Sequence, residues 1–183
     1  MTQLPAASPV AVLAELEARA LGVARVLPEE LELRDESGRY IGFRLGSMRL
    51  LAPLNEITAI SPYPELTRVP GSASWLRGIS QLRGRLLNVV DLSELAGEGL
   101  SPIGRGTRLL VVANEETLNG LIVDEVFGTK NHTGDSLPST TLVDWPWLAG
   151  VVDVEVEIDQ ERWGVLGVAA LLAHPDFASA ASQ

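Results

Sequence analysis

The clearest structural signal in the chain is Pro70-Gly-Ser-Ala-Ser-Trp75-Leu-Arg-Gly78-Ile-Ser-Gln-Leu-Arg-Gly84-Arg-Leu-Leu-Asn-Val-Val-Asp91-Leu92. Two apolar runs lie on either side of a Leu-Arg-Gly turn, which predicts strands near Gly78–Arg83 and Leu86–Leu92. Trp75 carries a large apolar area, so we expect it in the core or lining a groove. The same expectation holds for the other three tryptophans, Trp145, Trp147 and Trp163.

Short apolar runs broken by Gly, Pro, Asn and Asp continue along the chain from Arg39. About ten short strands with regularly spaced turns are typical of β-barrels or a sandwich. No strand–helix–strand repeat is evident, which argues against a doubly wound α/β fold. The remaining predicted strands lie near Tyr40–Leu45, Arg49–Pro53, Ile57–Ser61, Arg108–Ala113, Leu118–Asp124, Glu125–Thr129, Ala149–Val152, Val154–Asp159 and Arg162–Leu166.

Two segments look alike, because each reads as strand, turn and strand ending in an aspartate, Asp91 in one and Asp124 in the other. This similarity suggests two related sub-barrels. The segment Val152–Asp159 alternates apolar residues with four carboxylates. A single strand would spread those carboxylates over about 20 Å. We therefore expect a solvated face or a charge-protected edge strand rather than a calcium site.

The N-terminal 37 residues are predicted to form a helical arm and linker. Ser8 can cap the helix, Pro9 suits its first turn and Pro28 ends it. The apolar stripe consists of Val12, Leu13, Leu16, Ala20, Val23 and Leu27. It can pack on its own domain, on a partner or on a second copy. The expected domain boundaries are 1–37 for the arm, 38–173 for the folded domain and 174–183 for a C-terminal tail.

Charge and composition exclude several classes of protein. The 183 residues suit one domain or two small ones. A net charge of -10 argues against a nucleic-acid binder, and zero cysteines exclude disulfides and thiolate metal sites. Counting Lys and Arg against Asp and Glu, residues 1–36 carry -4, 37–107 carry +3 and 108–183 carry -9. This asymmetry suits electrostatic docking to a protein, or it merely solvates the surface.

The sequence shows no catalytic motif that we can assign. The two histidines, His132 and His174, lie on an apparent turn and near the C-terminus, and no G-x-S-x-G elbow is present. The Gly-rich stretch 97–106 fits neither phosphate-binding motif. A small metal-dependent hydrolase would require His132 to meet Asp135, Asp153 or Glu155. We expect no cofactor, no metal and no enzyme activity. No signal peptide or membrane-spanning run is evident, so the expected location is cytoplasmic.

The Leu-Arg-Gly and Val-Val-Asp-Leu blocks together resemble the CheW-like coupling domain of bacterial chemosensory systems. The matching positions are Pro70, Trp75, Gly78, Leu82, Arg83, Gly84, Val89, Val90, Asp91 and Leu92. Further matches are 120–126, 150–152 and 168–172, so the resemblance covers about 39–173. Asn88 stands where the family usually has Pro, which leaves the pairing of that strand open. The helical arm and the segments 42–46, 52–57 and 67–78 resemble the branch that serves type IV pilus (twitching motility) systems.

The resemblance implies a mainly β fold of two small five-stranded β-barrels that share an apolar core, with an N-terminal helix and a short C-terminal helix. It implies a non-catalytic adaptor that couples a chemoreceptor to a CheA-type histidine kinase. The partners would be the regulatory domain of the kinase and the cytoplasmic tip of a methyl-accepting chemoreceptor. The adaptor would be recruited to membrane-associated receptor arrays without inserting into the membrane. A flagellar chemotaxis array or another array is the alternative to the pilus system.

The resemblance also implies roles for individual residues. Leu54, Glu56, Gly78, Arg83 and Val89 are expected to contact partners, and Trp75, Gly84, Asp91 and Asp124 to be structural. Gly78 should permit a close backbone approach. Arg83 is the first candidate for the receptor groove, the alternative being an ion pair with Asp91 or Asp124. Both aspartates are expected to cap turns or to hold that arginine.

Overall fold

The computed structural model describes residues 38–114, 117–138, 147, 149–152 and 154–178. The helical segments are η1 (Leu54–Glu56), α2 (Leu92–Leu95), α3 (Val168–Ala173) and α4 (Pro175–Ala178). The strands are β1 (Arg39–Leu45), β2 (Met48–Pro53), β3 (Ile57–Pro62), β4 (Leu76–Leu82), β5 (Arg85–Val90), β6 (Arg108–Ala113), β7 (Leu118–Val123), β8 (Glu125–Asn131), β9 (Leu137–Pro138), β10 (Val154–Ile158) and β11 (Glu161–Val165).

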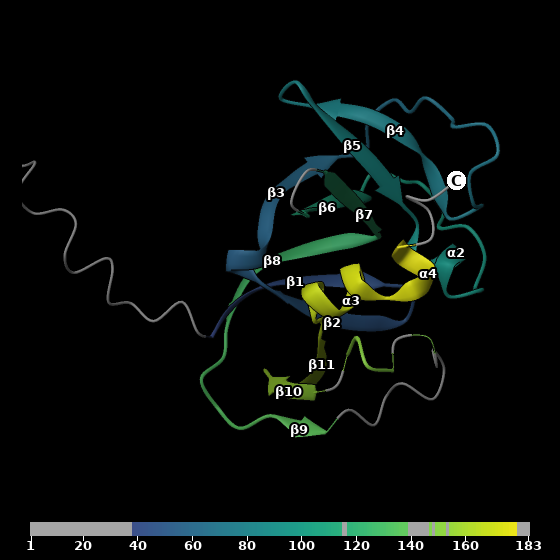
Figure 1. The fold of residues 1–183 in the computed structure, drawn as a ribbon. Helices are drawn as coiled ribbons and strands as arrows, with labels where there is room; N and C mark the ends of the chain where they lie inside the picture. The colour runs from purple at the N-terminus through teal and green to yellow at the C-terminus, as the bar shows by residue number, and fades with distance from the viewer. Residues whose placement is uncertain (1–37, 115–116, 139–146, 148, 153, 179–183) are drawn as a thin grey trace, which may run out of the picture. The chain divides into compact units, whose positions relative to one another are not determined.

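These strands form two sheets (Figure 1). One has the order β8-β1-β2-β11-β10-β9 and the other β3-β6-β7-β5-β4. The prediction of a mainly β protein with two β units is confirmed. In the part of the chain that the structure describes, neither strand order closes on itself, and the two-residue β9 makes the first sheet six-stranded. The units are therefore open sheets rather than the closed five-stranded barrels we expected.

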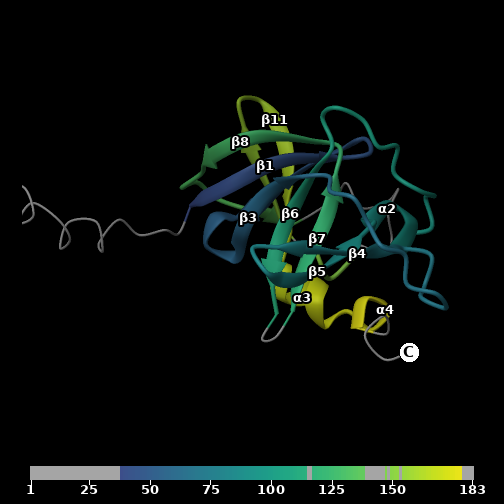
Figure 2. The same cartoon turned by 90° about the horizontal axis from the view of Figure 1, so that it is seen from above.

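The inner strands bury side chains on both faces, as on β7, where all six residues are buried, and this explains their unbroken apolar runs in the sequence. Successive side chains on a strand point to opposite faces. On β6, Leu110 and Val112 enter the core between the sheets, whereas Leu109 and Val111 enter a separate core on the far face. A third core, around Trp163, covers the far face of the six-stranded sheet. Figure 2 shows β1 and β8 of one sheet beside β6 and β7 of the other. The shared apolar core is confirmed.

Apart from β9, the two sheets share one pattern of strand pairing. In the six-stranded sheet, β2 of hairpin β1–β2 pairs in parallel with β11 of hairpin β10–β11, and β8 flanks β1. In the five-stranded sheet, β7 of hairpin β6–β7 pairs in parallel with β5 of hairpin β4–β5, and β3 flanks β6. The chain thus exchanges strands, because β3 follows β2 and β8 follows β7. The look-alike segments of the sequence, β4–β5 and β6–β7, share one sheet, so assigning them to separate sub-barrels was wrong.

Two other strand predictions are corrected. The segment 149–152 is a turn rather than a strand, and its apolar Val151 and Val152 fill the core between the sheets. Their apolar character reflects burial, which strand propensity does not distinguish from strand pairing. On β10 the predicted solvated face fails at Glu155, which is only 2% exposed. Strand β10 is not an edge, because β9 and β11 pair with it on both sides.

The C-terminal helix expected from the resemblance is present as α3, and two short helices, α2 and α4, were not predicted. In α4, Phe177 is buried and stacks on Trp75 with ring centroids 5.9 Å apart. This helix lies where the sequence suggested a tail from residue 174. The predicted N-terminal arm, residues 1–37, lies outside the described residues, as does Trp145. In the described part of the chain, no helix has the length and apolar character needed to cross a membrane.

Candidate functional site

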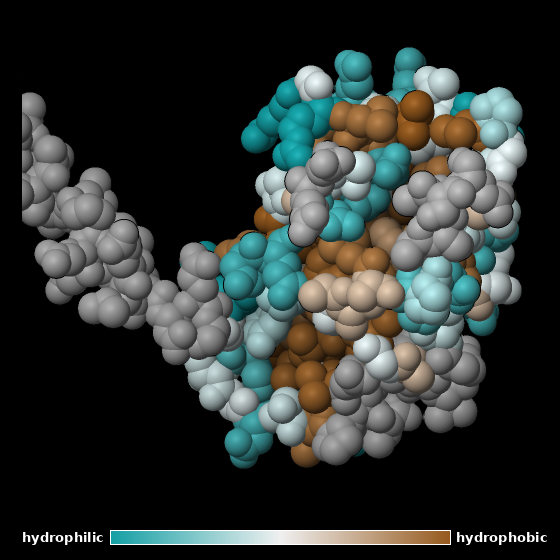
Figure 3. All heavy atoms as spheres, viewed as in Figure 1, coloured by the Kyte–Doolittle hydropathy of each residue, from teal (hydrophilic) through white to brown (hydrophobic). Residues whose placement is uncertain are grey.

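The β4–β5 hairpin ends in a two-residue turn, because Leu82 pairs with Arg85 and leaves only Arg83 and Gly84 between the strands. Both turn residues have positive φ, +52° and +80°, as a type I′ turn requires. Arg83 and Arg85 are exposed, and neither contacts an acid among the residues that the structure describes. Leu86 beside them is 53% exposed. Apolar atoms over β4 and β5 lie beside hydrophilic ones at the top of Figure 3. We call residues 83–86 the hairpin tip.

Asp91 is fully buried where β5 meets α2, and four donors converge on its carboxylate. Oδ2 accepts from Arg77 Nη1 and from the backbone N of Ser101, both at 2.9 Å. Oδ1 accepts from Ser101 Oγ at 2.7 Å and from the backbone N of Glu94 at 3.4 Å, which caps α2. The predicted capping role of Asp91 agrees with this geometry. Its arginine partner is Arg77, so the alternative that paired it with Arg83 was wrong.

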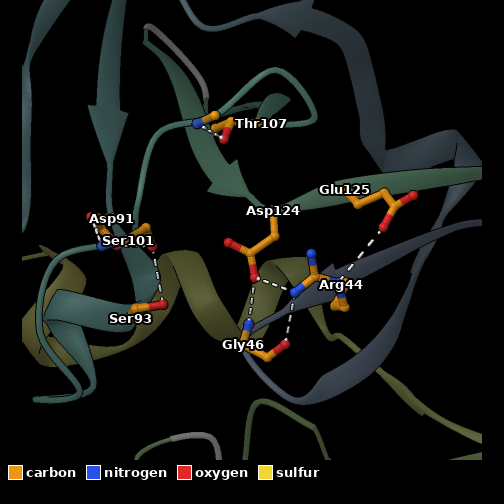
Figure 4. Close-up of polar contacts among 9 residues, drawn as sticks. Arg44, Gly46, Asp91, Ser93, Ser101, Thr107, Asp124 and Glu125 are labelled. Carbon is orange, nitrogen blue, oxygen red and sulfur yellow. Dashed lines mark hydrogen bonds and ion pairs between the residues drawn. The ribbon is translucent and has the colours of Figure 1, made fainter.

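Asp124 lies at the crossover from β7 to β8 and ties it to the turn between β1 and β2 (Figure 4). Its Oδ2 accepts from the backbone N of Gly46 at 2.8 Å and from Arg44 Nη1 at 3.1 Å. Its own backbone N donates to the Arg44 carbonyl at 3.0 Å, and Glu125 lies 3.8 Å from the same guanidinium. Asp124 therefore joins the two sheets, and again the arginine is not Arg83.

Two of the expected partner contacts are occupied by the chain itself. Gly78 has φ +145°, and a Cβ there would lie 2.6 Å from the Thr67 carbonyl oxygen. The close approach that we predicted at Gly78 is thus made by Thr67, which exchanges two backbone hydrogen bonds with Ile79. Val89 is fully buried in the far core of the five-stranded sheet. The side chain of Val89 therefore cannot contact a partner in this structure, because its alternation along β5 points it inward.

Leu54 and Glu56 lie on η1, at the crossover from β2 to β3. Leu54 is half-buried against the core between the sheets, and Glu56 is exposed. Asn88, at the unusual position, lies on β5 between β4 and β7. Strand β5 thus pairs on both sides, and the Asn88 Nδ2 also donates to Asn119 Oδ1 of β7 at 3.4 Å. Leu54, Glu56 and Arg83 thus stay available, and they come from two separate places in the fold.

The histidines lie apart from the hairpin tip. The His132 backbone donates to the Gly38 carbonyl, and His174 lies beside Trp147 with ring centroids 5.0 Å apart. Among the residues that the structure describes, no group of three or more His, Asp or Glu side chains is arranged to hold a metal ion. The sequence analysis did not identify Arg77 and Ser101 as contacts of Asp91, or Arg44 as a contact of Asp124, because their spacing in the sequence does not indicate these contacts.

Three comparisons with known proteins agree with this architecture. The CheW-like domain family model matches residues 39–176. Protein PilI of Pseudomonas aeruginosa is 34% identical over 174 residues, covering 93% of this chain and 94% of that protein. Protein FrzA of Myxococcus xanthus is 32% identical over 100 residues, covering 54% of this chain and 62% of that protein. The scaffolding protein TtCheW of Thermoanaerobacter tengcongensis has the same fold, with a TM-score of 0.64 at 20% identity, covering 76% of this chain and 90% of that one. This chain belongs to the CheW-like domain family.

Proposed function

We propose that the protein is a non-catalytic adaptor that couples a chemoreceptor to a CheA-type histidine kinase in an array controlling type IV pilus twitching motility. The similarity to PilI over nearly the whole chain supports the pilus system. Similarity to FrzA and to the chemotaxis protein CheW of Helicobacter pylori, 28% identical over 112 residues, supports another chemosensory array as the second candidate. In either case the adaptor would work at membrane-associated receptor arrays.

The observation that carries the proposal is the hairpin tip. A type I′ turn holds two arginines in the open, and an exposed leucine follows them. Guanidinium groups favour fixed, bidentate contacts with carboxylates. A partner surface that offers acidic side chains next to an apolar patch would fit this tip, and we assign it to the receptor. Glu56 and Leu54 on η1 form a second contact of opposite charge, for which a basic partner surface is suitable.

The test is binding of the purified full chain to the regulatory domain of the kinase and to a receptor-tip fragment at constant salt. We expect Arg83→Ala and Glu56→Ala each to weaken binding to at least one partner about tenfold, equivalent to ~1.4 kcal/mol. Arg68→Ala and Glu65→Ala serve as matched controls, because both residues are exposed and lie outside the tip and η1. Failure of the folded wild-type chain to bind either partner would contradict the adaptor role.

A further inference from the structure

The loop between α2 and β6, residues 97–107, holds two large apolar side chains in the open. Leu100 is 58% exposed and Ile103 is 43% exposed. Between them, Ser101 is buried and bound to Asp91 through both its backbone N and its Oγ. At the far end Thr107 is buried, and its Oγ1 accepts from the backbone N of Gly104 at 2.9 Å. These two polar anchors fix the loop with its apolar side chains pointing outward.

An open hollow of about 800 Å³ borders this loop. Its other wall consists of the turn between β1 and β2 together with Asp124 and Glu125, and the polar contacts around it are drawn in Figure 4. Leu100 also borders a smaller hollow of about 320 Å³, whose lining includes Val69. Leu100 therefore lines both hollows. Because hydrogen bonds at Ser101 and Thr107 already hold the loop backbone, binding would cost little backbone conformational entropy.

The larger hollow combines the apolar Leu100 and Ile103 with acidic side chains. Its lining includes the carboxylates of Glu98, Asp124 and Glu125 and a single base, Arg44, a net charge of -2. That base is already engaged by Asp124 at 3.1 Å and lies 3.8 Å from Glu125. The hollow therefore offers negative charge beside apolar surface, which is complementary to a cationic and apolar occupant.

We propose that this hollow is a docking surface for a basic amphipathic segment of a partner protein. A bulky apolar side chain of that segment would lie against Leu100 and Ile103, and an Arg or Lys would face Glu98 and Glu125. The surface shares no residue with the hairpin tip or with η1, so the inference does not depend on the adaptor role. It gives the protein a third contact, with a charge preference opposite to that of the tip.

The test uses a fluorescent synthetic peptide with leucines at helical spacing flanked by arginines, titrated into the full chain at one low salt concentration. Two matched peptides replace either the arginines by glutamates or the leucines by alanines. We expect the first peptide to bind and both matched peptides to bind at least tenfold more weakly. Amide chemical-shift changes should fall on residues 97–107, 44–47 and 124–125.

Variants of the chain locate the site. Leu100→Ser and Glu98→Gln should each weaken peptide binding several-fold. Leu137→Ser and Glu157→Gln are the matched controls, since Leu137 is 55% exposed, Glu157 is exposed, and neither residue lines the hollow. Leu100→Ser should still bind the kinase domain and the receptor fragment as the wild type does, which separates this inference from the adaptor role. Equal binding to wild type and Leu100→Ser, or shifts elsewhere on the surface, would overturn it. So would a Leu100-dependent dimer that excludes the peptide, because the occupant would then be a second copy.

Discussion

Replacing Asp91 by alanine should be among the most destabilising single changes in the described part of the chain. The substitution removes the acceptor of four hydrogen bonds and leaves the Arg77 guanidinium, 19% exposed, without its ion-pair partner. Breaking a buried pair by removing one partner typically costs about 3–5 kcal/mol. This is a large fraction of the ~5–15 kcal/mol that stabilises a typical domain. Asp91→Asn keeps one acceptor oxygen but loses the charge, so we expect a loss of about 1.5–3 kcal/mol.

Urea unfolding followed by tryptophan fluorescence measures this loss directly. The Asp91 backbone N donates to the Trp75 carbonyl at 2.9 Å, so the network lies next to a fluorescent reporter. Asp135→Ala is the control, since Asp135 is exposed and we expect a change below about 0.5 kcal/mol there. A double-mutant cycle with Arg77→Ala isolates the ion pair. A loss below about 1 kcal/mol for Asp91→Ala, with an unchanged dependence on urea, would refute the reasoning.

Three further substitutions test other parts of the structure. Gly78→Ala should lower the free energy of unfolding in urea by about 1–3 kcal/mol, because φ is +145° and the new Cβ would clash with Thr67. Gly104→Ala is the control and should lower it little, because the space around Gly104 is open. Asp124→Ala should lower stability by about 1–3 kcal/mol by leaving the Gly46 amide and Arg44 without their acceptor, and a loss no greater than that of Glu125→Ala would contradict this. Trp163→Ala should cost about 3–5 kcal/mol by emptying the far core of the six-stranded sheet, seen as a lower thermal midpoint.

Local sequence patterns were sufficient to predict most strands, because each apolar run is bounded by turn residues close to it in the sequence. The strands near Arg108–Ala113 and Ile57–Ser61 agree closely with β6 and β3. The segment 149–152 was misassigned because core burial without strand pairing produces the same apolar signature. The burial of Glu155 was missed for a different reason. Strand β10 is covered on one edge by β9, which has only two residues and therefore shows no alternation in the sequence.

The ion pairs of Asp91 and Asp124 could not be predicted from the sequence. Asp124 and Arg44 are 80 positions apart, and only the exchange of β8 into the first sheet brings them together. Asp91 pairs with Arg77 rather than with Arg83 because of the turn at the end of the β4–β5 hairpin. Arg83 occupies a left-handed turn position that carries its side chain into the open. Motif spacing identified the aspartates correctly and gave no information about which arginine would reach them.

The strand exchange has a consequence for folding that can be measured. Each sheet receives one flanking strand from the chain segment that builds the other, β3 in one direction and β8 in the other. Neither sheet can then separate without losing a strand as well as the shared core, so we expect a single cooperative unfolding transition. Trp75 stacks on Phe177 beside the five-stranded sheet, and Trp163 lies in the far core of the other. In chains that keep either Trp75 or Trp163 as the single tryptophan, with the other three replaced by Phe, the midpoint of the fluorescence change should coincide with the midpoint of the far-UV circular dichroism change of the same chain. Separate midpoints would show that one sheet survives alone, and the exchanged strands would then hold the units together less tightly than the topology implies.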